Sequence, residues 1–358
     1  MKTVESVHSK IEIGSLLSGS LSDILDQYKT ENIIVIVDEN THDFCLEFLI
    51  NNFPALDRAE VILLPVGEEN KVLEVCFQVW EAFSEFNFSK NDLVINLGGG
   101  VVTDMGAFIA CLFKRGMNFL HIPTSLLGMV DASIGGKNGV DLNGFKNQLG
   151  LIKHPSHILI DPFFLTSLPE REIYNGYAEM LKHGLISSAE LWKRLIEIKS
   201  DEELIAKDLI YEVVKIKVAI VDVDPEEKNI RKTLNFGHTI GHAIESHFMD
   251  TTAIAHGHAV ALGICGEAYL SMKKKMLSLE DYKQIEKIIK SNFPLIQFSD
   301  EDIKDVIERM RQDKKNTKGK ISCVLLTAIG AAKYDCLLTD KEIGEALFHL
   351  NLLASALN

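Results

Sequence analysis

Two histidines lie four residues apart in the segment LNFGHTIGHAIES, residues 234–246. In a helix this spacing places His238 and His242 on one face. Two imidazoles on one face suit a divalent metal, and they also suit one metal ligand beside a proton-transfer group. Gly237 and Gly241 belong to the same pattern and cost helix stability by roughly 1 kcal/mol each. We therefore expect a close contact at these glycines that offsets the cost.

Further candidate ligands stand on either side of this segment. His256 and His258 follow in AHGHAVALG, before another helical pattern. Glu179 lies in NGYAEMLKHGL, an otherwise apolar helical stretch, and a buried carboxylate needs a partner that a metal could supply. For any one histidine, a satisfied polar residue at a helix end is the commoner explanation. The set taken together favours a metal site.

A glycine-rich turn, NLGGGVVTDMGAF at residues 96–108, follows an apolar strand and opens a helix. Glycines let the backbone approach a pyrophosphate, and the start of a helix offers unpaired N–H groups. The segment is not the G-x-G-x-x-G fingerprint, and a plain tight turn explains it equally well. Asp38, at the end of an earlier strand, could bind a ribose hydroxyl or cap a helix. Glu68 and Lys71, in VGEENK, could bind a ligand or belong to a charged loop.

The stretch DASIGGKNGVDLNGFKNQLG, residues 131–150, is rich in glycine and amide residues. Lys137, Lys146 and Asn147 could bind the oxygens of a charged small molecule, together with backbone N–H groups. Taken one at a time, most lysines are solvated surface charges. Further basic candidates lie elsewhere in the chain: Arg115, Lys182, Lys217, Arg231 and Lys314.

The elements that position these residues differ between the two halves of the 358-residue chain. Short apolar runs at residues 33–37, 61–64, 93–97 and 119–122 alternate with helical patterns, which predicts a parallel sheet covered on both faces. From about residue 169 the patterns are mostly helical: 170–186, 190–197, 208–223, 230–248, 259–275 and 279–291. The sequence therefore predicts an α/β N-terminal domain with a Rossmann-like parallel sheet, residues 1–160, and an all-α C-terminal domain, residues 161–358.

Composition narrows the class of protein. The net charge of −14 argues against general affinity for nucleic acid, although a local group of Lys and Arg can still bind a small anion. The six cysteines show no CxxC pair or metal-finger spacing, so we expect reduced thiols. The first residues lack an apolar signal core, and no run approaches the roughly 20 apolar residues of a membrane span. We expect a cytoplasmic protein that binds neither membrane nor nucleic acid.

Ten motifs follow one another between about Asp38 and Leu326: PVGEENK (65–71), GGGVVTD (98–104), KRG (114–116), IPTSLL (122–127), VDASIGGK (130–137), FKNQLG (145–150), AEMLKHG (178–184), LNFGHTIGHAIE (234–245), HGHAV (256–260) and DKK (313–315). In type and order they closely resemble the motifs of the 3-dehydroquinate synthase family. Each motif alone is weak, but chance agreement in all ten is negligible.

The resemblance implies an N-terminal domain that binds NAD, a C-terminal domain that carries zinc or cobalt, and a homodimer in which Arg115 reaches across the interface. It implies Glu179, His238 and His256 as the metal ligands, with His242 as a catalytic or substrate-contacting histidine. The NAD-binding residues that it implies are Asp38, Glu68, Lys71, Gly99, Gly100, Val101, Asp104, Thr124, Ser125, Asp131, Lys137, Lys146, Leu165 and Thr166. The phosphate and carboxylate of the substrate would fall to Lys137, Lys146, Asn147, Lys182, Lys217, Arg231, Asn235 and Lys314.

The resemblance also implies a reaction. The substrate of the family is an acidic sugar phosphate, 3-deoxy-D-arabino-heptulosonate 7-phosphate, which becomes 3-dehydroquinate and phosphate in the shikimate pathway of aromatic amino acid biosynthesis. NAD oxidises the substrate transiently, phosphate is eliminated, the hydride returns, and an internal aldol step closes the ring. One departure is His258, which stands where the family usually has Glu. The resemblance therefore does not indicate which side chain lies beside the metal at this position.

Three other functions are compatible with parts of the sequence. Another sugar-phosphate cyclase could use the same scaffold, but Lys137 and Arg231 favour a substrate that carries a carboxylate. A metal-dependent polyol dehydrogenase would also pair NAD with a metal, and it would release NADH. A non-catalytic metal- or nucleotide-binding module would leave many polar residues of these motifs unexplained.

Overall fold

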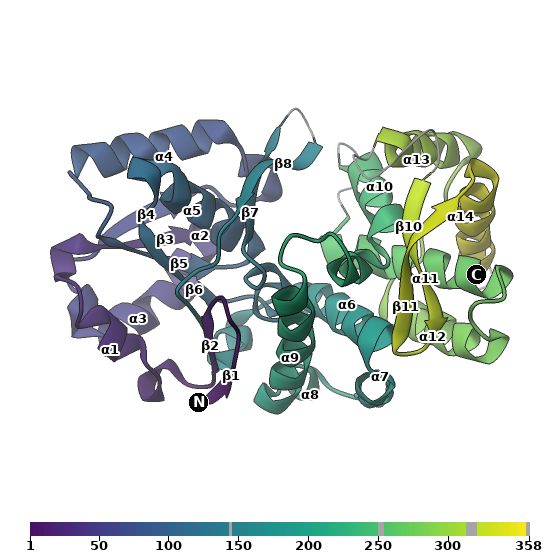
Figure 1. Ribbon diagram of the computed structural model, residues 1–358, viewed down its shortest axis with the longest axis horizontal. Helices are drawn as coiled ribbons and strands as arrows, with labels where there is room; N and C mark the ends of the chain where they lie inside the picture. Colours follow the sequence, from purple (N-terminus) through teal and green to yellow (C-terminus); the bar gives the residue numbers. More distant parts are fainter. Residues whose placement is uncertain (143–144, 250–253, 313–320, 356–358) are drawn as a thin grey trace. The chain divides into compact units, whose positions relative to one another are not determined.

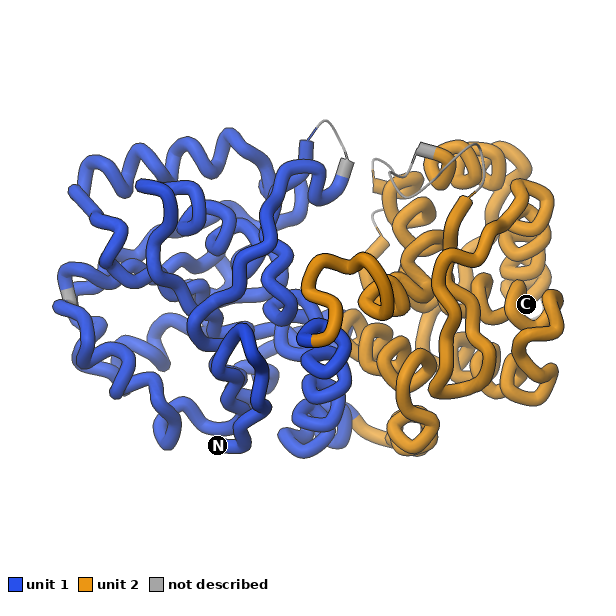
Figure 2. The backbone as a smooth tube through the Cα atoms, viewed as in Figure 1, with its two compact units in different colours: residues 1–173, 201–222 blue, residues 174–200, 223–358 orange. Residues whose placement is uncertain are grey.

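The computed structural model describes residues 1–142, 145–249, 254–312 and 321–355. Its contacts divide the chain into two compact units (Figure 2): unit 1 comprises residues 1–173 and 201–222, and unit 2 comprises residues 174–200 and 223–358. The sequence predicted a single boundary, between residues 160 and 161. In the structure the chain leaves unit 1 within helix α6, Glu170–Ser187, and returns to it for most of helix α9, Lys207–Val223.

A seven-stranded sheet forms the centre of unit 1 (Figure 1), with the strand order β1-β2-β9-β6-β5-β3-β4. Neighbouring strands are parallel except for β1 and β2. The four predicted strands correspond to β3, β4, β5 and β6, whereas β1, β2 and β9 were too short to be identified. The bounds are β1 Lys2–Val4, β2 Lys10–Ile13, β3 Ile33–Asp38, β4 Glu60–Leu64, β5 Leu93–Gly98, β6 Asn118–Pro123 and β9 His157–Ile160.

The apolar sequences of the central strands explain why helices cover this sheet. Every residue of β5 is buried, as are all residues of β3 before Asp38, and such strands need a cover on both faces. Phe83 and Met105 join Ile34 and Val94 in one apolar cluster, which places helices α4 and α5 on the same face. The helices of unit 1 are α1 Leu21–Leu25, α2 Glu39–Thr41, α3 Glu47–Asn52, α4 Leu73–Glu85, α5 Gly100–Leu112, α8 Asp201–Leu204 and α9.

Unit 2 is largely helical, as predicted (Figure 1). Helix α11 lies at its centre, because it packs against α10, α12, α14 and strand β10 and most of its residues are buried. An antiparallel pair, β10 Ile321–Ala328 and β11 Ala331–Leu338, was not identified from the sequence, although β11 alternates between more and less exposed residues. Besides α6, the helices are α7 Ala189–Ile196, α10 His238–Phe248, α11 His256–Lys273, α12 Leu279–Asn292, α13 Asp300–Gln312 and α14 Asp340–Ser355.

The helix predicted for residues 230–248 is two elements in the structure. Residues Ile230–Asn235 form a 3₁₀ turn, and α10 begins only at His238. Gly237 between them has a φ of +78°, in the left-handed region that favours glycine, and a Cβ there would lie 2.6 Å from the Cγ1 of Ile264. His238 is therefore the first residue of a helix, which its spacing from His242 did not reveal.

None of the helices in the described part of the chain combines the length and the apolar sequence that crossing a membrane requires.

Candidate functional site

In unit 1 the predicted cofactor residues gather at the carboxyl ends of sheet strands. Strand β4 lies on one side of β3, and the later strands β5 and β6 lie on its other side, so the direction of winding reverses between β3 and β5. Open α/β sheets bind ligands beside the carboxyl ends of the strands at such a reversal. Asp38 ends β3 and Gly98 ends β5, which places the predicted ribose and pyrophosphate residues at this point.

Asp38 caps helix α2, which was one of the two interpretations of this residue. Its Oδ1 accepts hydrogen bonds from the Thr41 backbone N–H at 2.7 Å and from the Thr41 hydroxyl at 2.9 Å. Both bonds use Oδ1, so a ribose hydroxyl could still donate to Oδ2. The cap orients the carboxylate and does not exclude a role in binding.

The glycine turn brings the start of helix α5 close to its neighbours. A Cβ on Gly99 would lie 3.2 Å from the Oγ of Ser125, and a Cβ on Gly100 would lie 3.3 Å from the Cβ of Ala132. Gly99 precedes the helix and offers no side-chain cap, so the first amides, including that of Val101, can face an anion. This is the close approach that the triplet permits.

The other predicted cofactor residues follow the next strands of the sheet. Thr124 and Ser125 come directly after β6, where the Thr124 N–H donates to the carbonyl of Gly98 at 3.0 Å. Leu165 and Thr166 belong to a 3₁₀ segment, Pro162–Ser167, that follows β9. Leu165 is buried and Thr166 is exposed. Because β6 and β9 are neighbours, both pairs lie at the same edge of the sheet as the glycine turn.

A buried lysine organises the charged residues of unit 1. The Lys71 Nζ lies 2.7 Å from Asp104 Oδ2 and 2.9 Å from Asn147 Oδ1. Glu68 Oε1 lies 3.9 Å from the Lys71 Nζ and 3.5 Å from the Lys146 Nζ. Burial opposes the charged form of Lys71, but Asp104 and Glu68 outweigh it and raise its pKa. The structure thus joins five of the predicted residues in one network.

Three further groups of predicted residues in unit 1 have contacts or positions of their own outside the Lys71 network. Lys217, on α9, lies 2.8 Å from Asp131 Oδ1 and also donates to the Asp131 carbonyl. Lys137 is exposed at the start of the hairpin formed by β7, Lys137–Leu142, and β8, Phe145–Ile152. Arg115 is exposed at the end of a 3₁₀ turn, with a φ of +68°.

In unit 2 the three predicted metal ligands converge. The Glu179 Oε1 lies 3.2 Å from His238 Nε2 and 3.4 Å from His256 Nε2. Ligand atoms that bind one zinc ion in tetrahedral geometry are about 3.4 Å apart. Glu179 is fully buried, with both imidazoles beside its Oε1 and the Lys182 ammonium beside its Oε2. One carboxylate and two imidazoles at these spacings fit a divalent cation.

The orientation of both imidazoles supports this fit. The His238 Nδ1 contacts the backbone carbonyl of Phe236 at 3.1 Å, and the His256 Nδ1 contacts Glu245 Oε2 at 3.3 Å. A carbonyl or a carboxylate can only accept, so each Nδ1 carries the proton and each Nε2 faces Glu179. Histidines that bind metals are held in this way, with the second nitrogen bonded to a carbonyl or a carboxylate.

The charges around the cluster set the protonation of its members. Burial raises the pKa of Glu179, but Lys182 and His238 outweigh it and hold that pKa well below the usual range. Burial lowers the pKa of His238 despite the proximity of Glu179. Burial also opposes the charged form of His256, yet Glu245 and Glu179 outweigh it and raise the pKa to about 10. Before a cation binds, His256 therefore carries a second ring proton and a positive charge at neutral pH.

The two remaining histidines have different positions. His242 lies beside the cluster: its ligand nitrogen and those of His238 and His256 are all within 4.8 Å of one another. It could serve as a ligand or as the predicted proton-transfer group. His258 points elsewhere, because its Nε2 donates to the carbonyl of Pro294 at 2.6 Å. In this orientation His258 is not placed to compete with His256 for a cation.

The predicted anion-binding residues of unit 2 have different contacts in the structure. Lys182 is buried, and its Nζ forms an ion pair with Glu179 Oε2. Arg231 is also buried, and its Nη1 donates to the carbonyl of Pro225 at 2.6 Å. Lys314 lies outside the described residues.

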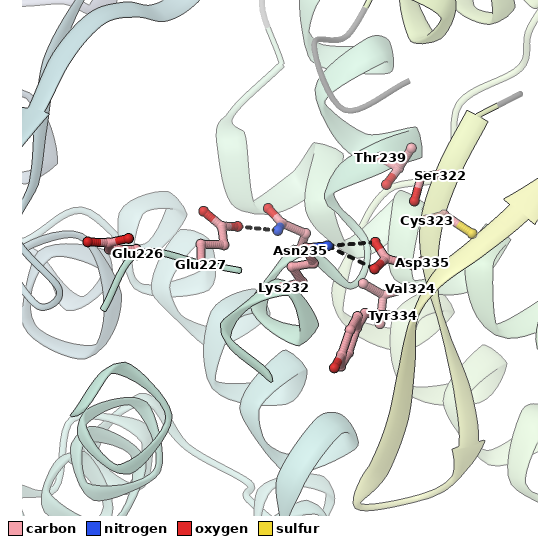
Figure 3. A pocket seen from close by; sticks show the side chains of 10 residues that line it. All are labelled: Glu226, Glu227, Lys232, Asn235, Thr239, Ser322, Cys323, Val324, Tyr334 and Asp335. Atoms are coloured by element: carbon pink, nitrogen blue, oxygen red, sulfur yellow. Dashed lines mark hydrogen bonds and ion pairs between the residues drawn. The ribbon is translucent and has the colours of Figure 1, made fainter. Parts of the chain in front are cut away.

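Glu227 is a residue of unit 2 that was not predicted from the sequence. Its Oε1 accepts a hydrogen bond from the amide of Asn235 (Figure 3), and its backbone has a φ of +58°, which is rare for glutamate. Both residues line a pocket of about 280 Å³ that also contains the ion pair between Lys232 and Asp335, 2.8 Å apart. The acidic sequence DPEE, residues 224–227, was the feature of the sequence that could have indicated a functional residue here. The full lining is Glu226, Glu227, Lys232, Asn235, Thr239, Ser322, Cys323, Val324, Tyr334 and Asp335.

Comparisons with solved structures relate the fold to proteins of known activity. The structure of the 2-epi-5-epi-valiolone synthase ValA from Streptomyces hygroscopicus subsp. jinggangensis 5008, with NAD+ and Zn2+ bound, superposes with a TM-score of 0.80 at 24% identity over 98% of both chains. That of 2-deoxy-scyllo-inosose synthase, complexed with carbaglucose-6-phosphate, NAD+ and Co2+, gives 0.81 at 21% identity over 97% of this chain and 99% of that one. At these identities the likeness shows a common fold.

Sequence comparisons are more specific. The N-terminal domain of 3-dehydroquinate synthase matches residues 61–175, and its C-terminal domain matches residues 176–316. The curated 3-dehydroquinate synthase of Parabacteroides distasonis is 40% identical over 341 residues, which cover 94% of this chain and 96% of that protein. The chain therefore belongs to the 3-dehydroquinate synthase family.

Proposed function

We propose that this chain is a 3-dehydroquinate synthase, a lyase that converts 3-deoxy-D-arabino-heptulosonate 7-phosphate into 3-dehydroquinate and phosphate. The reaction belongs to the shikimate pathway of aromatic amino acid biosynthesis. The observation that carries the proposal is the convergence of Glu179, His238 and His256, in a chain that is 40% identical to a protein named for this activity.

Two bound groups would supply the redox and acid chemistry: a divalent cation, zinc or cobalt, polarises a substrate oxygen, and NAD takes up a hydride and gives it back. Glu179, His238 and His256 would hold the cation. Glu245 would keep the His256 ring in its orientation through Nδ1. His242 would contact the substrate or move a proton at its ring nitrogen. The two similar cyclases hold NAD+ with Zn2+ or Co2+, which supports this pairing.

The residues of unit 1 would bind NAD by their positions on the sheet. Asp38 would accept a ribose hydroxyl at Oδ2. The amides at Gly99 and Gly100 would face the pyrophosphate, with Thr124 and Ser125 beside them. The network around Lys71 would hold its charged members in place, because every member contacts another at hydrogen-bond or ion-pair distance.

Phosphate elimination requires cationic residues that bind and orient an anion. Lys137, Lys146, Lys217 and Arg231 would serve this purpose, with Asn147 and Asn235 as further donors and Lys314 as a prediction outside the described residues. The departing phosphate can itself remove the proton from the neighbouring carbon when it is held in place. In that case the protein contributes mainly orientation and electrostatic stabilisation.

Replacing Lys137 tests this role. We expect Lys137→Ala to lower kcat by about 100-fold or more, because an oriented cation is lost where the anion departs, while the Kd for NAD measured by calorimetry stays the same. Lys90→Ala, which removes another exposed lysine of unit 1, should leave both values unchanged. Weaker NAD binding with normal turnover at saturating NAD would show that Lys137 serves the cofactor instead.

One assay separates the proposed activity from its rivals. The purified protein is incubated with NAD, zinc and the heptulosonate phosphate, and released phosphate and NADH absorbance are recorded together. We expect phosphate release without accumulation of NADH. Equal or faster phosphate release from a seven-carbon sugar phosphate that lacks the carboxylate would favour another cyclase, and steady NADH formation from a neutral polyol would favour a dehydrogenase.

We also propose that the enzyme is a cytoplasmic homodimer and that Arg115 acts in the active site of the partner subunit. Arg115 is exposed on a turn and is followed by Gly116, which has a φ of +117°. A side chain presented in this way is available to a second copy of the chain.

A further inference from the structure

The two histidines proposed as metal ligands share an unusual position: each is the first residue of a helix. His238 begins α10 and His256 begins α11. The preceding residues, Gly237 and Ala255, make no side-chain capping bond. The first amides of a helix need acceptors from elsewhere, so the ends of α10 and α11 depend on other elements.

Glu267 provides the acceptor for α10. Its Oε2 accepts a hydrogen bond from the Gly237 N–H at 2.7 Å, and its Oε1 accepts one from the Ile240 N–H at 3.2 Å. Glu267 lies on α11 and is fully buried. A carboxylate at this position also faces the positive end of the helix dipole. The start of α10, and with it His238, is therefore held by the helix that carries His256.

Asn175 provides the acceptor for α11. Its Oδ1 accepts a hydrogen bond from the Gly257 N–H, directly after His256. Asn175 lies on α6 four residues before Glu179, so the two side chains share a face of that helix. A Cβ on Gly257 would lie 2.3 Å from the Asn175 carbonyl oxygen, which shows how closely α6 and α11 approach there.

The three helices therefore form a chain of caps. Helix α6 carries Glu179 and caps α11, while α11 carries His256 and caps α10, which carries His238. We propose that Glu267 and Asn175 are positioning residues, which fix the two histidines relative to Glu179 without touching the metal. This inference rests on the metal ligands proposed above and adds the groups that hold them in place.

The test compares two cap variants with a matched control. Glu267→Gln and Asn175→Ala each weaken a cap beside a ligand. Ser278→Ala removes a cap of the same unit that is remote in sequence from the ligands, since the Ser278 Oγ accepts from the Asp281 N–H at the start of α12 at 3.0 Å. For each protein, the zinc Kd is measured by competition with a chromophoric chelator. The visible spectrum of the cobalt form and the melting temperature of the metal-free form are also recorded.

We expect the two cap variants to bind zinc about 10- to 100-fold more weakly, as is typical when residues that support metal ligands are changed, and to shift the cobalt spectrum. Ser278→Ala should lower the melting temperature and leave the Kd and the spectrum unchanged. Asn175→Asp, which keeps an acceptor at the same place, should retain the wild-type Kd.

Unchanged zinc Kd and cobalt spectra in folded cap variants would overturn the proposal, because the caps would then serve stability alone. If Glu267→Gln does not fold, the zinc Kd and cobalt spectra of Asn175→Ala and Asn175→Asp test the proposal by the same criteria. If the wild-type protein binds neither zinc nor cobalt, the proposed function fails and the positioning role fails with it. Metal binding by the wild type with no effect in the variants rejects the positioning role alone.

Discussion

Glu179 carries the charge around which the proposed metal-binding cluster is arranged. Lys182 and His238 keep its pKa well below the usual range, although burial acts in the opposite direction. His256 faces this carboxylate and Glu245 as well, which raises the pKa of His256 to about 10 in spite of burial. Without a bound cation, positively charged side chains therefore balance the buried carboxylate.

This arrangement predicts how metal affinity depends on pH. A metal takes a neutral imidazole, and His256 must lose a proton at any pH below about 10. His238, whose pKa is lowered, is already a neutral imidazole at neutral pH. We expect the affinity for zinc to rise about tenfold per pH unit between pH 7 and 8.5, as release of one proton requires. Chelator competition at several pH values measures the slope.

The same raised pKa stabilises the metal-free fold below about pH 6.5, the value of an unfolded histidine. That contribution is lost as the pH rises toward about 10.

A zinc affinity that does not change between pH 7 and 8.5 would contradict the raised pKa of His256.

At the residue scale the sequence predicted the types of the metal ligands but not the groups that orient them. The spacing of His238 and His242, and the isolated Glu179, predicted a metal site before the family motifs were considered. Glu245, Glu227 and Glu267 were missed. Their roles depend on tertiary contacts, such as that between Glu267 and the Gly237 amide, which no local pattern encodes.

At the scale of elements, glycines allow α10 and α11 to pack with their backbones in contact. A Cβ on Gly263 would lie 1.9 Å from the Gly237 carbonyl oxygen and 2.7 Å from the Gly241 amide nitrogen. A Cβ on Gly241 would lie 2.8 Å from the carbonyl oxygen of Ala259. This close packing explains Gly241, whose cost to the helix predicted a contact of this kind, whereas Gly237 precedes the helix in a left-handed conformation.

A methyl group at position 263 tests the packing. We expect Gly263→Ala to lower the free energy of unfolding by about 1–3 kcal/mol or more, because backbone atoms must move apart to accommodate it. Gly344→Ala is the control: its Cβ would meet the Ile307 Cδ1 at 3.9 Å, so the better helix propensity of alanine should stabilise the protein by up to about 1 kcal/mol. Urea unfolding measures both. Equal stability of Gly263→Ala and the wild type would refute the packing argument.

The elements themselves were predictable where their patterns were long. Continuous apolar runs located β3, β5 and β6, because strands buried on both faces need such runs. The edge strand β4 carries a similar apolar run, although most of its residues are only partly buried. The short strands at Lys10–Ile13 and His157–Ile160 carry too few residues for a pattern. The break before His238 depends on the left-handed conformation of Gly237, which periodicity does not register.

At the scale of the whole molecule, the chain passes between its units more often than the sequence suggested. Residues 201–222 belong to unit 1 although residues 174–200 belong to unit 2. Lys217 is thereby placed beside Asp131 in unit 1. Hydrophobic patterning could not reveal this, because the buried apolar residues of α9 show that the helix packs against a core but not which unit supplies that core.

The proposed dimer makes a prediction about mixed subunits. If Arg115 acts in the partner's active site, then Arg115→Ala and Lys137→Ala subunits, each inactive alone, form mixed dimers with one intact site. After unfolding and refolding together in equal amounts, we expect about a quarter of wild-type phosphate release, since half of the dimers are mixed. Refolding each variant alone is the control. If Arg115 acts within its own subunit, the mixture stays inactive.

Anomalous X-ray diffraction at the zinc edge, from crystals grown with zinc, tests the proposed metal site itself. We expect one strong peak in unit 2, bound by an oxygen of Glu179 and by the Nε2 atoms of His238 and His256. A peak bound by His238, His242 and His256 with Glu179 turned away, or a peak at other residues, would contradict it.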